Sequence, residues 1–451
     1  MNVGNSGFRS IRSEIEYHLK SYWYTLVKLG ELTGINPGNI SEILRNKRAM
    51  TIGHLDSFAK AFGYEADWLY DLYAKEECIY GGKVSRARAV SFLIRCVEIG
   101  RYDYMQPLIA SLLETKSLNI LFTVAKQLFD NRKLKDSAYF YQLIIDNEKN
   151  SYSDRFIMSH YRLFRALQGT NAEENWKAVI RFEPYRDRLH IDYQLDSLLQ
   201  LANVCFALHK WKEVVKYADE LRELATFVYD TELRKPNKER KPLKSERHLV
   251  VYYGQGYLVK AAALKKQGLY EEAKQYVYGY TDLKWFELLD EKGYEEVNKF
   301  EMWGKINLYT LDLLLGNFHS LEECADYLEN YPNEIFAALV TITEAANKHG
   351  FCIDSILQRF SHHIVSNPID KENALNVSRH FRFRYQKAIY ELQRGRYTIA
   401  IDEILLAIKL SGILNQYLAL KRCVSLFEKY RNHASKSQII AYKNIVSEGN
   451  E

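Results

Sequence analysis

The chain has 451 residues, enough for two or three domains, and 47% are hydrophobic, which is ample for a buried core. Only 7 prolines and 22 glycines favour an all-α fold, and a net charge of +5 excludes wholesale coating by nucleic acid. Six scattered cysteines argue against a zinc site or a disulfide framework. A polar N-terminus and the lack of a long apolar run predict a cytoplasmic protein without signal peptide or membrane span.

The segment Thr25–Arg48 predicts two helices joined by a tight turn and followed by basic residues. Thr25 is placed to cap the first helix, and Asn36 to cap the second. Gly34 suits the left-handed residue that ends a helix, and Gly30 leaves room for the second helix to cross closely. In such an arrangement one helix lies in the DNA major groove while the other braces it.

Three further helices complete a predicted head over residues 9–76. One runs from Ile11 to Lys20, one lies between Thr51 and Gly63, and the last contains Trp68 and Tyr73. Apolar residues at helical spacing are expected to face inward. They are Leu26, Leu29, Leu32, Ile40, Ile43, Leu44, Leu55, Phe58, Ala59, Phe62, Leu69 and Leu72.

Five short helices with this turn resemble the repressor-type helix-turn-helix fold of phage repressors and their bacterial relatives. The segment Ile40–Arg48 carries most of the resemblance. The resemblance implies DNA contacts by Asn36, Pro37, Gly38, Asn39, Ser41, Glu42, Arg45, Asn46, Lys47 and Arg48. Glu42 suits cytosine N4, whereas Pro37 and Gly38, at family base-reading positions, offer no side-chain hydrogen bond. Arg45, Lys47 and Arg48 are expected to hold phosphates.

Basic charge is local to the head. Residues 9–63 hold 8 Lys/Arg against 5 Asp/Glu, a net charge of +3, whereas residues 9–80 hold 9 against 10, a net charge of −1. The alternative interpretation is that the head docks a protein. The next segment, Lys83–Arg101, carries 5 basic residues and one Glu, and either touches the DNA backbone or forms a solvated helix face.

A pattern recurs along the rest of the chain: a small or apolar residue, a Gly-like turn, an aromatic or apolar residue, and another small residue. The clearest copy is Ala388, Gly395, Tyr397, Ala400 and Ala407. Looser copies are Ala261, Gly268, Tyr270 and Ala273; Ala202, His209, Trp211 and Ala218; Ala125, Leu134, Ser137 and Ile144; and turns at Gly100, Gly316 and Gly350. The pattern resembles tetratricopeptide repeats, which stack into a right-handed α-solenoid with a concave face. The alternative is a generic α-solenoid.

These observations predict four parts. Residues 1–80 form the helix-turn-helix domain, 81–101 a basic linker and first body helix, 102–413 a tetratricopeptide-like peptide-sensing domain, and 414–451 C-terminal capping and dimerisation helices. Two loops interrupt the repeats. Thr231–Arg247 has seven Lys/Arg and is either a solvated loop or a second nucleic-acid contact, and Ser366–Lys371 is a shorter inter-helix loop.

A repressor-type head on such repeats resembles the peptide-pheromone-sensing regulators of Gram-positive bacteria, their plasmids and phages, most nearly the phage arbitrium receptors, which choose between lysis and lysogeny. The likeness rests on Ile35–Leu44, and on Leu69–Tyr73 followed by Ser85–Val90. It implies a quorum-sensing transcription regulator. A short signalling peptide in the groove would shift two heads of a homodimer and change their affinity for a double-stranded DNA operator with paired half-sites. Dimerisation would involve Leu414–Val446.

The repeat register predicts which side chains face that groove: Asn203, Gln255, Thr310, Arg382, Tyr385 and Gln393. Asn and Gln suit a peptide backbone because each amide carries a donor and an acceptor. Arg382 suits a peptide carboxylate or an acidic side chain.

Neither catalysis nor a cofactor is predicted. Some relatives of the family dephosphorylate response regulators through a helical N-terminal domain, but here the head takes that place. The chain has no P-loop, H-E-x-x-H or G-x-S-x-G motif. Gly254-Gln-Gly256 lacks a third glycine, and His362 and His363 are poorly placed to share a metal. A repeat scaffold that binds a protein partner, with the head as a docking module, is the alternative function.

Overall fold

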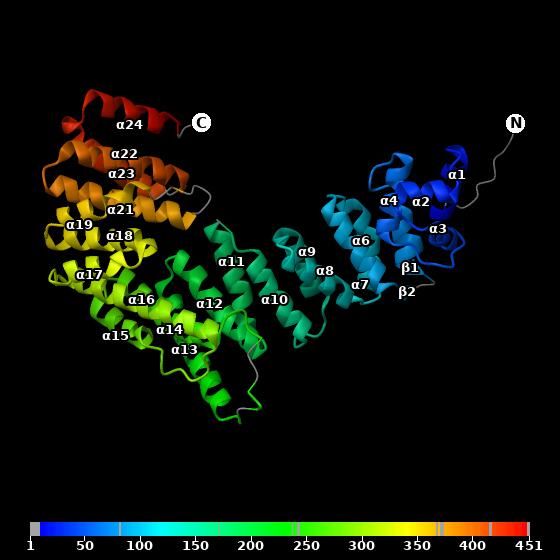
Figure 1. Ribbon diagram of the computed structural model, residues 1–451, viewed down its shortest axis with the longest axis horizontal. Helices are drawn as coiled ribbons and strands as arrows, with labels where there is room; N and C mark the ends of the chain where they lie inside the picture. Colours follow the sequence, from blue (N-terminus) through cyan, green and yellow to red (C-terminus); the bar gives the residue numbers. More distant parts are fainter. Residues whose placement is uncertain are drawn as a thin grey trace. The chain divides into compact units, whose positions relative to one another are not determined.

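The computed structural model describes residues 10–80, 83–169, 171–236, 238–240, 244–366, 369, 374–414 and 417–448. Over these residues the all-α prediction is confirmed, with one two-stranded ribbon added (Figure 1). Arg9 and most of the predicted Ser366–Lys371 loop lie outside them. A search of the same residues finds no helix with the length and apolarity needed to cross a bilayer. The chain divides into two compact units, residues 1–197 and 198–451.

Unit 1 begins with the helices of the predicted head and continues into helical hairpins. Its elements are α1 (Ile11–Ser21), α2 (Leu26–Thr33), α3 (Pro37–Leu44), α4 (Ile52–Phe62), α5 (Tyr70–Tyr73), the π-helix η1 (Ala74–Cys78), β1 (Ile79–Tyr80), β2 (Lys83–Val84), α6 (Arg86–Glu98), the 3-10 helix η2 (Tyr102–Met105), α7 (Gln106–Glu114), α8 (Leu118–Asp130), α9 (Leu134–Asn147), α10 (Asp154–Ala166), α11 (Ala172–Phe182) and the 3-10 helix η3 (Glu183–Arg188). The two strands are antiparallel. Helix α12 (Ile191–Ala207) runs across the division into unit 2.

The ends of α2, α3 and α4 follow from local chemistry, as predicted. The Thr25 hydroxyl and the Asn36 amide oxygen accept hydrogen bonds from the backbone N–H groups of their first turns. Gly34 ends α2 with a φ of 70°, which is the left-handed conformation. The fifth helix is shorter than predicted, because Leu69 has a φ of 60° and α5 starts only at Tyr70.

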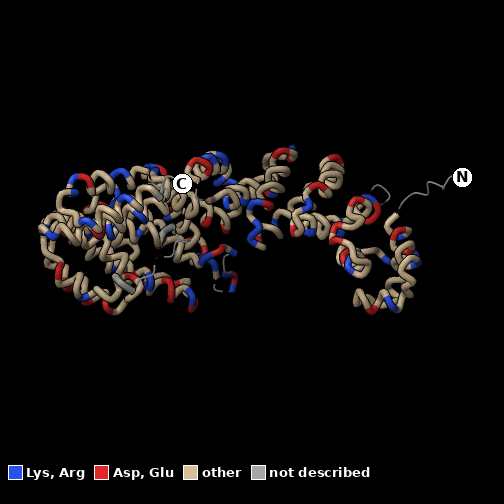
Figure 2. Tube along the Cα trace, turned by 90° about the horizontal axis from the view of Figure 1, so that it is seen from above, with Lys and Arg blue, Asp and Glu red and all other residues tan. Residues whose placement is uncertain are grey.

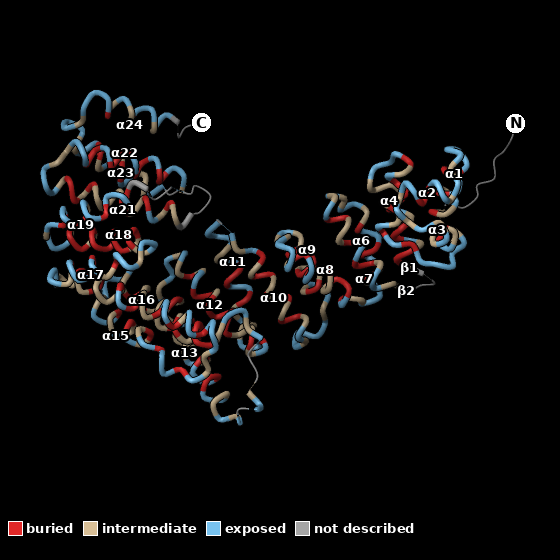
Figure 3. The backbone as a smooth tube through the Cα atoms, viewed as in Figure 1, coloured by how far each residue is buried: buried red, intermediate tan, exposed pale blue. Residues whose placement is uncertain are grey.

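The head does not have a core of its own. Its buried residues, including Ile43 and Phe58, belong to one hydrophobic cluster with residues of α6 to α10 such as Phe92 and Leu121 (Figure 3). Of the residues expected to face inward, Leu32 is instead 45% exposed. The predicted boundary at residue 80 therefore lies inside a continuous core, whereas the compact units divide at residue 197.

Unit 2 continues the succession of antiparallel helices. Its elements are α13 (Trp211–Leu233), α14 (Leu249–Lys266), α15 (Tyr270–Thr281), α16 (Glu291–Leu315), α17 (Ser320–Glu329), α18 (Pro332–His349), α19 (Asp354–Arg359), α20 (Ser361–Ser366), α21 (Ala374–Gln393), α22 (Tyr397–Ile413), α23 (Tyr417–Tyr430), the 3-10 helix η4 (Arg431–His433) and α24 (Lys436–Glu448). Most consecutive helices pack against each other, and α14, α16, α18 and α21 also pack one on the next. Consecutive packing of this kind is consistent with a helical repeat.

One turn geometry recurs between paired helices in both units. The turns at Gly100, Arg132, His209, Gly268 and Gly395 each have a left-handed φ, between 58° and 81°. In each case the next residue donates its N–H to the carbonyl five residues back, at 2.9–3.0 Å. The small residues of the sequence pattern, such as Ala388 and Ala400, are buried in the seams between helices. The pattern thus predicted where the chain turns and which side chains lie between helices.

Candidate functional site

The turn between α2 and α3 packs directly on α2. A Cβ atom at Gly30 would lie 2.8 Å from the Ile35 carbonyl oxygen and 3.0 Å from Cγ of Pro37. Real Cβ atoms do not approach so closely, so only glycine allows this contact. The predicted close approach at Gly30 is confirmed, and it fixes α3 against α2.

Helix α3 buries Ile40 and Ile43 and exposes its opposite side. It ends in a Schellman turn, in which Asn46 has a φ of 56° and the Lys47 N–H bonds to the Glu42 carbonyl at 2.8 Å. This turn places four polar side chains in solvent directly after α3. They are Arg45, Asn46, Lys47 and Arg48.

Three of the predicted DNA-contacting residues are brought together on the exposed side of α3. Nη1 of Arg48 donates a hydrogen bond to Oδ1 of Asn39 at 3.0 Å and lies 3.8 Å from Oε2 of Glu42. The positive charge of Arg48 also lowers the pKa of His54, after the larger effect of burial. Asn36 is placed differently, since its Oδ1 is already occupied by the Gly38 N–H at 2.8 Å. Asn39 and Ser41 are half-buried, so they contribute less surface than Glu42 and Arg48.

The C-terminal end of α3 is held by a buried ion-pair network that the sequence did not reveal. Nε of Arg12 donates to the Ile43 carbonyl at 2.9 Å. The same guanidinium pairs with Oε1 of Glu77 at 2.6 Å, and Arg88 pairs with Oε2 of Glu77 at 2.6 Å. Glu77 is 2% exposed and therefore depends on both partners. The partners are 65 and 11 residues away in sequence, so no local pattern marks them.

The basic segment Lys83–Arg101 fastens α6 and its flanks to the rest of unit 1. Besides Arg88, the side chain of Arg95 pairs with Asp56 at 2.8 Å, Arg101 pairs with Asp67, and Arg86 donates to Thr123 at 3.1 Å. These arginines form more than a solvated helix face, because each has a partner within unit 1. A contact of this segment with the DNA backbone stays a prediction.

The structure places the six predicted groove residues in different surroundings. Asn203 on α12 and Gln393 on α21 are exposed, and Gln255 on α14 is half-buried. Thr310 needs correction, because it is 2% exposed and its hydroxyl donates to the Asn307 carbonyl at 3.2 Å. Tyr385 packs against the hydrophobic cluster of α22 and α23, which turns it toward the C-terminal helices.

Arg382 lies in a cluster of charged residues from α14, α18 and α21. Its Nη2 atom is 3.5 Å from Oε2 of Glu344. Nζ of Lys265 donates to Oγ1 of Thr341 at 3.3 Å. Burial, followed by the charges of Lys266 and Arg382, lowers the pKa of Lys265 to about 8. Burial and Arg382 lower the pKa of Lys266 to about 8 as well.

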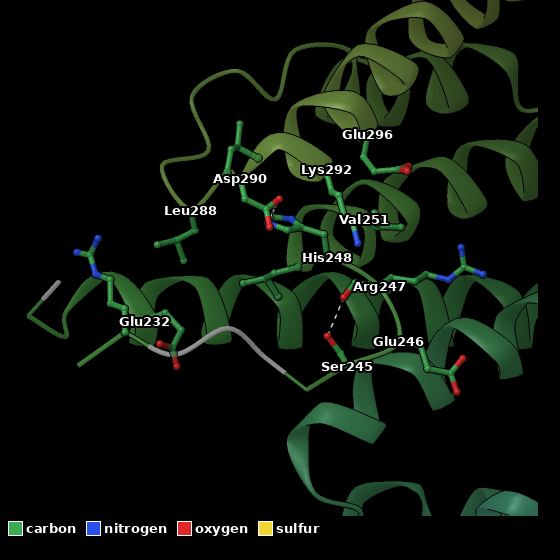
Figure 4. A pocket seen from close by; sticks show the side chains of 13 residues that line it. Glu232, Ser245, Glu246, Arg247, His248, Val251, Leu288, Asp290, Lys292 and Glu296 are labelled. Atoms are coloured by element: carbon green, nitrogen blue, oxygen red, sulfur yellow. Dashed lines mark hydrogen bonds and ion pairs between the residues drawn. The ribbon is translucent and has the colours of Figure 1, made fainter. Parts of the chain in front are cut away.

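A cavity of about 640 Å³ lies beside the described part of Thr231–Arg247 (Figure 4). Two helix caps border it: His248 accepts from the Val250 N–H, and Asp290 accepts from the Gly293 N–H. The lining mixes basic and acidic side chains: Arg240, Arg247, Lys292, Glu232, Glu246, Asp290 and Glu296. Such a balance does not favour nucleic acid. Residues 237 and 241–243 of this segment lie outside the described residues.

Other sequence features have structural explanations. A Cβ at Gly254 would lie 2.5 Å from the Phe300 ring, so this glycine permits close packing of α14 on α16. Five cysteines are buried, whereas Cys352 is exposed. Acidic and basic residues alternate along both units (Figure 2). Among the described residues, no three His, Cys, Asp or Glu side chains gather as metal ligands would.

No protein-family model matches the chain, and no curated protein matches it.

Proposed function

We propose that this protein is a DNA-binding transcription regulator whose affinity for its operator is set by a short signalling peptide bound in unit 2. One observation carries the DNA-binding part. Helix α3 is fixed on α2 through Gly30, presents an exposed polar side, and ends in a turn that displays Arg45, Lys47 and Arg48. These features support a helix that enters the major groove, with basic side chains that hold the flanking phosphates.

The polar side of α3 has groups suited to reading bases. Glu42 suits cytosine N4 as an acceptor, and Arg48 suits the O6 and N7 atoms of guanine. In the free protein Arg48 lies against Asn39 and Glu42. DNA binding would exchange these contacts for contacts with bases or phosphates, so Glu42 would act on Arg48 as well as on DNA.

Two observations support the peptide and the homodimer. Asn203 exposes an amide group able to pair with a peptide backbone, Gln393 is exposed with its Nε2 donating to the Asn347 carbonyl at 3.3 Å, and Arg382 lies in a basic cluster. The C-terminal helices α23 and α24 expose apolar side chains, with Leu418 72% exposed and Ile440 59% exposed. Their burial against a second copy would stabilise a dimer with two heads, which suits paired half-sites.

The DNA-binding part is tested by retention of genomic fragments on the purified protein at about 0.15 M salt, where phosphate contacts are screened as in cells. We expect a few sites with paired half-sites to be enriched. Replacing Arg45, Lys47 and Arg48 with Ala should abolish the enrichment. The matched control replaces Lys20, Lys60 and Lys75, which are exposed elsewhere on the head, and should retain it. Equal weak retention by all three proteins would contradict the proposal.

The peptide part is tested separately by thermal unfolding in the presence of pools of short synthetic peptides. A pool that raises the Tm of the wild type but not of a variant with Asn203→Ala and Arg382→Ala would support a peptide groove. Co-purification of a folded protein partner, with no response to any peptide pool, would favour the scaffold function instead.

A further inference from the structure

Three cations in unit 2 gather around one carboxylate. Lys265 and Lys266 come from the last turn of α14, Arg382 comes from α21, and Glu344 comes from α18. Glu344 acts on both amines and lies 3.5 Å from Arg382. With both amines protonated, one carboxylate leaves two positive charges uncompensated within the cluster.

The cluster joins α14 to α18, which have three helices between them in the sequence. The bond from Lys265 to Thr341 links residues 76 positions apart, past α15, α16 and α17. The inner, concave side of a curved helical stack is where side chains of non-consecutive elements can approach each other. The Lys266 side chain is exposed, yet surrounding protein lowers its pKa. The Lys266 side chain is therefore open to water while nearby protein desolvates its amine.

We propose that Lys265, Lys266 and Arg382 form a binding site for a carboxylate group on this concave surface. Given the function proposed above, on which this last step depends, the carboxylate belongs to the C-terminus or an acidic side chain of the signalling peptide.

Glu344 indicates why the ligand is a carboxylate. Its own carboxylate already lies beside Arg382, so the cluster accommodates this group and Glu344 competes with any carboxylate from solution. The Thr341 hydroxyl adds a polar group next to Lys265. Tyr270, at the start of α15, also lies near Glu344, which raises the pKa of its phenol after the larger effect of burial. Arginine and lysine together bind carboxylates through charge-assisted hydrogen bonds.

The probe is succinate, a dicarboxylate that stays ionised in neutral and alkaline solution, and its binding to the full chain is measured by calorimetry. NaCl of equal ionic strength is the reference, which removes general screening. At pH 8 about half of each amine is neutral, so binding of the anion should be accompanied by uptake of protons. The buffer supplies these protons, so the uptake is measured by comparing the binding heat in buffers of different ionisation enthalpy. At pH 7 the uptake should be smaller. The groups that act on Lys265 are Lys266, Glu344, Arg382 and Cys324.

Two substitutions in the cluster should change the affinity in opposite directions. Lys266→Gln should weaken succinate binding about fivefold to tenfold, because it removes one cation near the anion. Glu344→Gln should strengthen binding by a similar factor, because it removes the competing carboxylate. Lys409→Gln, at an exposed lysine on α22, should leave the affinity unchanged. The opposite signs guard against misfolding as an explanation, since a misfolded variant does not gain affinity.

The proposal is overturned if the wild type shows no saturable succinate binding, if binding takes up no protons at pH 8, or if Glu344→Gln weakens it. If succinate does not bind but peptide pools still raise the Tm of the wild type, the carboxylate site is refuted while the peptide-controlled regulator remains supported. Conversely, succinate binding in a protein that retains no DNA would support the site and contradict the proposed function.

Discussion

Lys265 is the residue whose replacement should most clearly separate function from stability. Its side chain is half-buried near Lys266 and Arg382, and the pKa of its amine falls from 10.5 to about 8. A fall of this size makes the charged form roughly 3 kcal/mol less favourable in the folded protein. Partial exposure screens part of that cost. The variant also loses the hydrogen bond to Thr341, which reduces the expected gain in stability by about 1 kcal/mol. We therefore expect Lys265→Met to stabilise the protein by about 1–2 kcal/mol at pH 7.

The pH dependence of the stability tests whether the charge of the Lys265 amine causes this gain. The pKa of Lys265 is about 8 in the folded chain and 10.5 in the unfolded chain, so the unfolded chain binds more protons between these values. The stability of the wild type should therefore rise as the pH passes from 8 toward 10.5. The variant lacks this group and its rise, so its advantage at pH 7 should disappear at the upper end of that range.

The assay is thermal unfolding followed by circular dichroism at pH 7 and at pH 10.5, with the wild type and Lys265→Met side by side. A gain of 1–2 kcal/mol corresponds to an increase in Tm of a few degrees for a unit of this size. Lys409→Met is the control and should change the Tm little at either pH. A loss of Tm for Lys265→Met at pH 7, of the same size at alkaline pH, would refute the argument from desolvation.

Three further predictions concern the other parts of the molecule. Gly30→Ala should destabilise the head by about 1–3 kcal/mol and weaken DNA retention, because the added Cβ would lie 2.8 Å from the Ile35 carbonyl oxygen; an unchanged Tm would count against the close approach. Glu77→Gln should destabilise unit 1 by about 3 kcal/mol in denaturant unfolding, because Arg12 and Arg88 lose their shared buried partner. Ile440→Glu should shift the sedimentation of a homodimer to that of a monomer, and the same mass for variant and wild type would exclude α24 from the interface.

Local chemistry explains what the sequence predicted correctly. Helix caps such as Thr25 and Asn36, and left-handed turns such as Gly268, involve residues within a few positions of each other. The pattern also placed the buried small residues, because each one packs against its own hairpin partner. These features need no knowledge of the remaining fold.

Long-range packing explains what the sequence missed. The repeat register predicted that Thr310 faces a groove, but it cannot tell which side of a helix the next hairpin covers, and Thr310 is covered. Lys265 meets Thr341 only because non-consecutive hairpins curve toward each other. Glu77 likewise gathers Arg12 and Arg88 from two separate helices. Ionic partners brought together in this way leave no spacing pattern in a single sequence.

The shared core and the ion pairs of unit 1 limit the ways in which peptide binding would change DNA binding. The head shares its core with α6 to α10, and Glu77 and Asp56 tie it to arginines of α6. Swinging the head about residue 80 would break this core and leave a buried carboxylate unpaired, which costs several kcal/mol. The differential affinity of a peptide for two states is typically 1–3 kcal/mol. Under the proposed function, the peptide would therefore move unit 1 as a body and change the spacing of two heads, while the fold of each head stays the same.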